Sequence, residues 1–255
     1  MRVGLCSVTL RALSASDVLK TMTAARLQCV EWGGDLHVPA GDLATARRVR
    51  RDSANAGVAI CSYGSYYRLA SSPRADGQAA LDSAAELGAA RVRVWAGSIP
   101  SAAATDKERA DVAADLAHLA AQAAAGGLAV ALEYHGGTLT DEASSALRLL
   151  REVAAPNVSL YWQPPLDLPD EPAVADALAI LPHASAVHVF SWFPGQSRRE
   201  LSFRQEMWRP VIAAATAAGV RDALLEFIPG DDPVFLPREA ETLRDWIRRA
   251  REDLA

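Results

Sequence analysis

The sequence has few cysteines, no surplus of basic residues and no long apolar run. Its 255 residues carry a formal net charge of −5, and its three cysteines are Cys6, Cys29 and Cys61. The odd number of cysteines, each in an apolar stretch, indicates buried thiols in a reducing compartment. The acidic balance argues against a nucleic-acid-binding surface, which needs a basic stripe. No stretch approaches the roughly 20 apolar residues of a membrane helix, and the N-terminus lacks a signal-peptide pattern. We therefore expect a cytoplasmic protein that binds neither nucleic acid nor a membrane.

A glycine-rich phosphate-binding turn is also missing. The first strand-like stretch, residues 3–8, leads into Thr9-Leu10-Arg11-Ala12 without a glycine. A doubly wound dinucleotide-binding sheet usually has such a turn after its first strand. The open doubly wound sheet is therefore the less favoured of two α/β folds.

Strand-like and helix-like stretches alternate along the whole chain. The predicted strands are 3–8, 29–32, 58–62, 91–95, 129–133, 158–162, 187–190 and 223–228. The predicted helices are 14–27, 42–56, 75–87, 106–125, 141–153, 172–181, 206–218 and 238–255. Eight such units without a long linker predict one domain, residues 1–255, folded as a single (β/α)8 TIM barrel.

Polar side chains follow the last four predicted strands at their carboxyl ends, where the active site of such a barrel lies. Glu133 ends the fifth strand, Gln163 follows the sixth, and His188 and Glu226 belong to the last two. Two carboxylates, an imidazole and an amide oxygen suit Mn²⁺, Mg²⁺ or Co²⁺, whereas zinc usually draws a set richer in histidine or cysteine. The amino ends of the strands carry no comparable set. We therefore predict a metal site made of these four residues.

Each of these residues also has a structural interpretation. A lone glutamate at a strand end can be a helix cap or an ion-pair partner, and Gln163 can be a hydrogen-bonding amide. The equivalent placement of two glutamates and a histidine on three strands favours the metal site.

Aromatic residues gather at the same strand ends, and they are Trp32, Tyr63, Tyr66, Tyr67, Trp95, Trp192 and Phe193. Aromatic faces pack against the C–H face of a sugar or against a planar ring, although some of these side chains can instead pack under the helices. His135 shares the side of its strand with Glu133, because side chains alternate along a strand.

These residues resemble the xylose isomerase-like barrel superfamily, in the branch of sugar phosphate isomerases and epimerases. The resemblance spans essentially the whole chain and rests on four stretches: Leu132-Glu133-Tyr134-His135-Gly136-Gly137-Thr138, Val187-His188-Val189-Phe190, Leu225-Glu226-Phe227 and Glu31-Trp32-Gly33-Gly34-Asp35-Leu36-His37. In that family a glutamate, an aspartate, a histidine and a second glutamate bind one divalent ion. The implied ligands here are Glu133, Gln163, His188 and Glu226, with Mn²⁺ expected ahead of Mg²⁺ or Co²⁺. Gln163 departs from the family's aspartate, which should weaken metal affinity and strengthen the ion as a Lewis acid, or mark a different reaction.

The resemblance implies proton transfer beside a carbonyl through an enediolate. Glu133 and Glu226 would act as acid and base as well as ligands, and which of them is the base is left open. The implied substrate-binding residues are His37, Tyr63, Trp95, His135, Trp192 and Arg198.

The expected function is a metal-dependent sugar isomerase or epimerase acting on a small sugar or sugar-like substrate. One alternative is a lyase or dehydratase that uses the same metal site on a keto-sugar, keto-inositol or glycoside. An open aromatic rim would favour this alternative. The other is a non-catalytic carbohydrate-binding barrel that has lost its metal through the change to glutamine. A homo-oligomer is left open.

Overall fold

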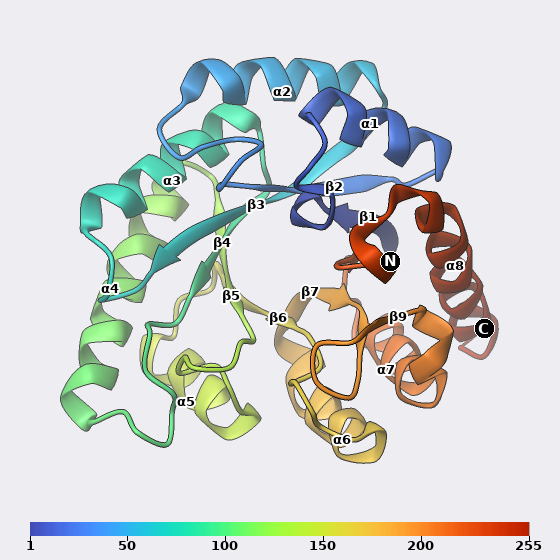
Figure 1. Cartoon of the computed structure of the whole chain (residues 1–255). Helices are drawn as coiled ribbons and strands as arrows, with labels where there is room; N and C mark the ends of the chain where they lie inside the picture. The colour runs from blue at the N-terminus through green and yellow to red at the C-terminus, as the bar shows by residue number, and fades with distance from the viewer. Residues whose placement is uncertain (255) are drawn as a thin grey trace.

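Eight parallel strands form a closed barrel with helices on its outside (Figure 1). The structure is a computed structural model and describes residues 1–254. Around the barrel the strand order is β1, β10, β7, β6, β5, β4, β3, β2, and β1 pairs with β10 to close it. The strands are β1 (Arg2–Cys6), β2 (Cys29–Gly33), β3 (Ala59–Arg68), β4 (Arg91–Trp95), β5 (Ala129–Glu133), β6 (Val158–Trp162), β7 (Ala184–Val189) and β10 (Asp222–Leu225). The predicted (β/α)8 barrel is confirmed.

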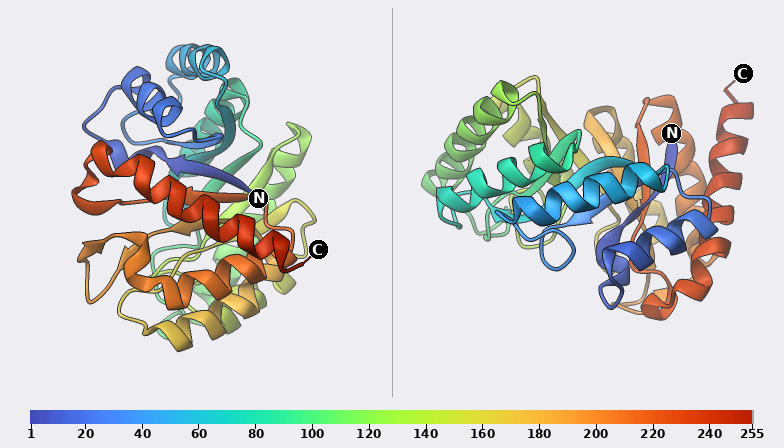
Figure 2. Two further views of the ribbon diagram at one scale, coloured as in Figure 1. Left: turned by 90° about the vertical axis from the view of Figure 1, so that its right-hand side faces the viewer. Right: turned by 90° about the horizontal axis from the view of Figure 1, so that it is seen from above.

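Eight α-helices cover the barrel, and the views of Figure 2 show α6, α7 and α8 side by side along one flank. The helices are α1 (Ala15–Ala24), α2 (Leu43–Asn55), α3 (Arg74–Leu87), α4 (Asp106–Ala125), α5 (Ala143–Val153), α6 (Asp170–Ile180), α7 (Gln205–Ala217) and α8 (Leu236–Glu252). Thr105 and Glu108 form a capping box at the start of α4, which explains why the helix begins there. None of the described helices is long and apolar enough to cross a membrane.

Three predicted element boundaries are wrong in ways that affect the site. The first strand ends at Cys6, and Ser7–Leu10 form a 3₁₀ turn. The third strand continues to Arg68, so Tyr63, Tyr66 and Tyr67, which lie beyond the predicted strand 58–62, belong to β3. The last strand ends at Leu225, so Glu226 begins the loop that follows. A short antiparallel hairpin, β8 (Ser191–Trp192) with β9 (Arg198–Arg199), also lies between β7 and α7.

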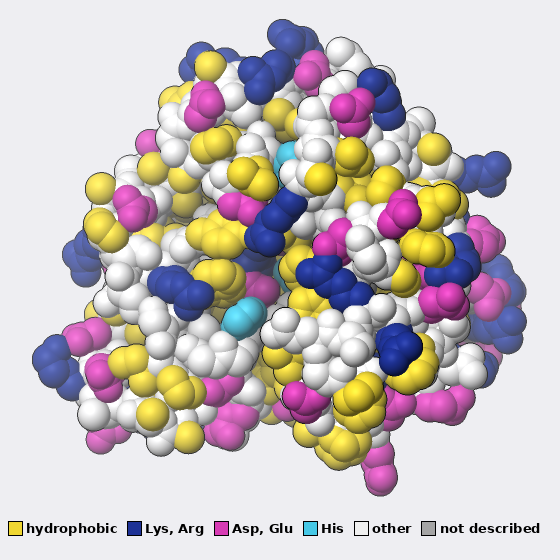
Figure 3. All heavy atoms as spheres, viewed as in Figure 1, with side chains coloured by type: hydrophobic (Ala, Val, Ile, Leu, Met, Phe, Trp, Pro, Cys, Tyr) yellow, Lys and Arg dark blue, Asp and Glu magenta, His cyan; other side chains and the backbone are white. Residues whose placement is uncertain are grey.

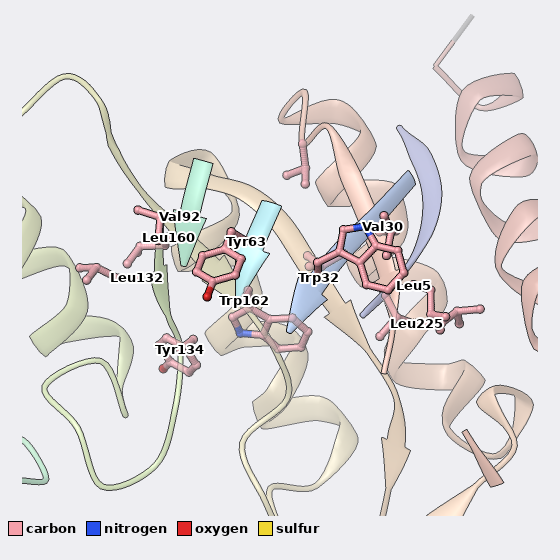
Figure 4. Packing of buried hydrophobic residues seen from close by; sticks show 14 of the residues in the cluster. Leu5, Val30, Trp32, Tyr63, Val92, Leu132, Tyr134, Leu160, Trp162 and Leu225 are labelled. Atoms are coloured by element: carbon pink, nitrogen blue, oxygen red, sulfur yellow. The ribbon is translucent and has the colours of Figure 1, made fainter. Parts of the chain in front are cut away.

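Apolar side chains fill the space between the strands and the helices. Figure 4 shows members of this core, among them Leu5, Val30, Trp32, Leu160 and Leu225. Side chains alternate along a strand, so the neighbouring positions point into the barrel. The hydrophobic cluster formed there is small: Cys29, Cys61, Ala131, Tyr161, Ala186 and Leu224. All three cysteines of the chain are buried and free.

Two arginines of β4 also lie on the inner side of the barrel, where four of these six residues are small: Cys29, Cys61, Ala131 and Ala186. Barrel interiors are usually filled by bulky branched residues, whereas Arg91 and Arg93 are both buried here. Arg91 Nη2 lies 2.5 Å from Asp222 Oδ2, and Arg2 Nε donates to Asp222 Oδ1 at 2.8 Å. The expectation that the amino ends of the strands carry no set comparable to that at the carboxyl ends is therefore wrong for these buried charges. It failed because Arg91 and Asp222 lie on different strands and meet only when the barrel closes.

Candidate metal and substrate site

The four predicted ligands converge on one point at the carboxyl end of the barrel. The nearest ligand atoms of Glu133, His188 and Glu226 all lie within 4.8 Å of one another. His188 Nδ1 is 3.1 Å from Gln163 Oε1, 3.3 Å from Glu226 Oε2 and 3.8 Å from Glu133 Oε1. Glu133 and His188 lie on β5 and β7, and Gln163 and Glu226 directly follow β6 and β10.

This donor set fits a divalent cation. Three oxygen acceptors surround His188 Nδ1, and a ring nitrogen can donate only one hydrogen bond. A cation placed between His188 Nδ1 and the three oxygens would accept the lone pairs of all four atoms.

The pKa of His188 also indicates that the acidic side chains around it favour a positive charge at this point. Burial disfavours the charged ring, but the charge of Glu226 and the contacts with Glu226 and Glu31 outweigh it and raise the pKa to about 10. Burial raises the pKa of Glu226, but the charge of His188 outweighs this and lowers it.

A buried arginine, which the sequence analysis missed, lies directly beside these ligands. Arg93 Nε donates to Glu31 Oε1 at 2.9 Å, and Arg93 Nη1 donates to Glu133 Oε2. Trp95 Nε1 donates to the same oxygen of Glu133. Glu31 Oε1 in turn lies 3.4 Å from His188 Nε2, on the side of the ring opposite the predicted ligands. Burial raises the pKa of Glu31, but the positive charges of Arg93 and His188 outweigh it and hold the pKa well below its usual range.

A signal for Arg93 is present in the sequence. Arg91-Val92-Arg93-Val94-Trp95 alternates charged and apolar residues in a strand covered on both faces, where continuous apolar character is expected. The alternation places both arginines on the inner side of the barrel.

Cys6, Glu31 and His188 form a second group with ligand atoms close together. Burial and the charge of Glu31 raise the pKa of the Cys6 thiol well above its ordinary value. A thiolate, the form that binds metals, is therefore disfavoured here, and the oxygen-rich group is the better candidate.

A cavity of about 520 Å³ opens beside the predicted ligands and is lined by Glu133, Gln163 and Glu226 among others. Figure 3 shows a hollow near the middle of this face with charged, histidine and hydrophobic side chains around it. Two aromatic groups line the cavity: Tyr66, Trp95 and His135 from one side of the barrel, and Phe190, Trp192 and Phe227 from the other. Within each group neighbouring rings are in contact, with centroids 4.7–5.4 Å apart.

Three of the predicted substrate-binding residues, Trp95, His135 and Trp192, line this cavity. Arg198 lies at its edge, with its guanidinium carbon 4.6 Å from the ring centroid of Phe227, and is paired with Asp231. Arg11 also lines the cavity and was not predicted. Its guanidinium donates to Asp35 at 2.8 Å and to Tyr66 at 2.6 Å.

The structure does not bring His37 and Tyr63 to the cavity. His37 is buried, with Nδ1 3.0 Å from Ser7 Oγ and Nε2 3.1 Å from Leu13 O, so both ring nitrogens are occupied. The Tyr63 hydroxyl donates to Val38 O at 2.8 Å within the core between strands and helices. Both side chains hold the loop after β2, and the prediction that they contact substrate is corrected accordingly.

The barrel and the acidic, histidine-containing cluster at its carboxyl end define an α/β barrel with a candidate metal centre. The family model of the xylose isomerase-like TIM barrel matches residues 23–249, and the chain belongs to this family. A search among curated proteins finds no match.

Solved structures share the fold at low sequence identity. The probable 3-DHS dehydratase AsbF from Bacillus anthracis superposes with a TM-score of 0.79 at 19% identity, covering 96% of this chain and 99% of that one. A xylose isomerase-like TIM barrel protein from Mycobacterium smegmatis, in complex with magnesium, has a TM-score of 0.74 at 15% identity and covers 98% and 97%. D-psicose 3-epimerase from Clostridium cellulolyticum, with D-tagatose, has a TM-score of 0.72 at 13% identity and covers 98% and 99%.

Proposed function

We propose that this barrel is a divalent-metal-dependent enzyme that transfers a proton next to the carbonyl group of a small sugar-like substrate, as an isomerase or epimerase. The convergence of Glu133, Gln163 and Glu226 oxygens on His188 Nδ1, beside a cavity, carries the proposal. The epimerase and the magnesium complex among the structural neighbours support it.

The residues around the cavity suit this chemistry. A divalent ion held by the four ligands would polarise the carbonyl and acidify the neighbouring C–H. Glu226 Oε2 faces His188, and among residues 1–254 no side chain or backbone N–H donates to its other oxygen, which leaves that oxygen for a substrate proton. Trp95 and Trp192 offer aromatic faces to the C–H side of a sugar ring and keep water away from it.

The lyase alternative is favoured by one specific contact. Glu133 Oε2 accepts hydrogen bonds from both Arg93 and Trp95, and Glu133 Oε1 faces the proposed ion beside His188 Nδ1, so of the two glutamates only Glu226 keeps an oxygen for substrate. Epimerisation needs proton-transferring groups on both faces of a carbon, whereas elimination can proceed with one. Glu226 would take the proton from carbon, the electron pair would form the C=C bond, and the leaving hydroxyl would take that proton from Glu226 and depart as water. The dehydratase among the neighbours supports this candidate.

The first test is metal content after incubation with Mn²⁺ and dialysis, measured by elemental analysis. The wild-type protein is compared with Glu133→Gln and with Glu239→Gln, whose carboxylate is also buried but pairs with Arg238 and accepts from the Leu201 N–H. One ion per chain in the wild type and the control, lost in Glu133→Gln, supports the site. If none of the three proteins retains an ion, the proposal is overturned, and the non-catalytic carbohydrate-binding barrel becomes the favoured alternative.

The second test separates the two reactions. Ketoses, inososes and keto-glycosides are incubated with the Mn²⁺-loaded protein in deuterium oxide. Deuterium at the carbon beside the carbonyl of a rearranged sugar supports the isomerase or epimerase. Release of water or of an aglycone, with a new C=C bond, supports the lyase.

A further inference from the structure

Four side chains from four strands form a closed ring of polar contacts that includes two of the candidate metal ligands. Glu133 Oε2 accepts from Arg93, whose Nε donates to Glu31 Oε1 at 2.9 Å. Glu31 Oε1 lies 3.4 Å from His188 Nε2, and His188 Nδ1 lies 3.8 Å from Glu133 Oε1. All four side chains are at least nine-tenths buried. Two members are candidate ligands, and Glu31 and Arg93 have no assigned role.

The contact between Glu31 and His188 determines which ring nitrogen is available to an ion. Among residues 1–254 the carboxylate of Glu31 is the acidic group close to Nε2, with Oε1 at 3.4 Å, and no group forms a hydrogen bond with this buried nitrogen. A proton on Nε2 is stabilised by this negative charge, which leaves the lone pair on Nδ1, the nitrogen that faces Gln163 and Glu226. A carboxylate behind a ligating histidine fixes its tautomer and raises its basicity.

Arg93 has the corresponding effect on Glu133. Its guanidinium occupies Oε2, so Glu133 presents Oε1 to the ion. Gly64 leaves the space for this arrangement, because a Cβ there would lie 2.8 Å from Arg93 Nη2 and 2.8 Å from Glu31 Oε1. The fork of the guanidinium thus links the candidate ligand Glu133 to Glu31 through fixed geometry, which a lysine ammonium cannot reproduce.

We propose that Glu31 and Arg93 are positioning residues of the metal site, with Glu31 orienting His188 so that Nδ1 faces the ion and Arg93 restricting Glu133 to one oxygen. This inference rests on the metal site proposed above. Neither residue contacts the ion, and both act through the ligand that they hold.

The experiment uses Mn²⁺ alone and needs no substrate. Isothermal titration gives the Mn²⁺ dissociation constant of the wild type, of Glu31→Gln and of the buried-carboxylate control Glu239→Gln. Thermal unfolding of the metal-free proteins reports whether each variant folds. The visible spectrum of the Co²⁺-loaded proteins reports the geometry of the ligands, which a merely structural loss elsewhere would not change.

We expect Glu31→Gln to bind Mn²⁺ about 10–100-fold more weakly, with an altered Co²⁺ spectrum, while the control keeps the wild-type values. A folded Glu31→Gln protein with wild-type affinity and spectrum overturns the inference and leaves the proposed function standing. A wild-type protein that binds neither ion overturns both.

A second pair of variants covers the case in which Glu31→Gln does not fold. Arg93→Lys and Arg91→Lys each shorten a buried arginine of the same strand, but Arg91 pairs with Asp222 in the layer below. We expect weaker Mn²⁺ binding in Arg93→Lys alone. Equal affinity in the two variants overturns the role of Arg93.

Discussion

A single methyl group at Gly64 should disturb the metal site. Gly64 lies in β3, and its backbone is outside the left-handed region, so alanine is permitted by its conformation. The added Cβ would lie 2.8 Å from both Arg93 Nη2 and Glu31 Oε1, closer than real Cβ contacts allow. Both atoms belong to buried side chains that are joined through Arg93 Nε and Glu31 Oε1, so neither side chain can move away without loosening this hydrogen bond. Overpacking of this kind typically costs about 1–3 kcal/mol.

Urea denaturation of the metal-free protein measures this cost, and Mn²⁺ titration measures its effect on the ligands. We expect the free energy of unfolding from urea denaturation to fall by that amount, a parallel thermal scan to show a melting temperature lower by roughly 2–4 °C per kcal/mol, and Mn²⁺ binding to be weaker. Gly136→Ala is the matched control, since nothing lies within 4 Å of its added Cβ. Wild-type stability and Mn²⁺ affinity in Gly64→Ala would show that Arg93 and Glu31 are not held against Gly64, and would refute the reasoning.

Further predictions concern Asp222, Glu226 and His37. Asp222→Asn should lower the free energy of unfolding by about 3–5 kcal/mol, because the buried Arg91 loses its counter-charge; a change below about 1 kcal/mol in urea denaturation would contradict this. Burial raises the pKa of Asp222, but the hydrogen bond from Arg2 and the charge of Arg91 outweigh it and lower the pKa. The stability that the ionised Asp222 provides is therefore fully present above about pH 4, and it is lost as the pH falls through the lowered pKa. Denaturation at pH 7 and pH 3 should therefore show a smaller acid loss in Asp222→Asn than in the wild type. Glu226→Gln should abolish Mn²⁺ retention and turnover, and normal turnover would exclude the proposed site. His37→Gln should cost about 1–2 kcal/mol by breaking its contacts with Ser7 and Leu13, yet leave the Mn²⁺ affinity unchanged in titration.

The barrel and the candidate ligands could be predicted from the sequence because both follow from local patterns. Alternating strand and helix stretches of suitable length indicate a parallel barrel, whose active end is known in advance. Polar residues at the ends of successive strands then fall at the same edge, as Glu133, His188 and Glu226 do. No knowledge of side-chain orientation beyond strand alternation is needed for this step.

The partners across the barrel could not be predicted in the same way. The sequence places Arg93 on the inner side of β4, but its contacts with Glu31 and Glu133 depend on strand register and on the small residues that leave it room. The roles of His37 and Tyr63 were wrong for a related reason. A polar side chain near the active end can turn back to bond the backbone of its own loop, and here both do so.

The arrangement separates the positioning of the candidate ligands from the recognition of a substrate. Glu133 and His188 are held by Arg93 and Glu31, which lie on strands and are almost fully buried. Trp192 and Arg198 instead belong to the β8–β9 hairpin, a two-stranded sheet separate from the barrel. Ligands supported by rigid strands keep their geometry when loops change, whereas residues on a hairpin can be exchanged without disturbing the barrel. Mutations in β8–β9 should therefore change which substrate is accepted and leave the Mn²⁺ affinity intact, while mutations of Glu31, Gly64 or Arg93 should change the affinity whichever substrate the enzyme uses.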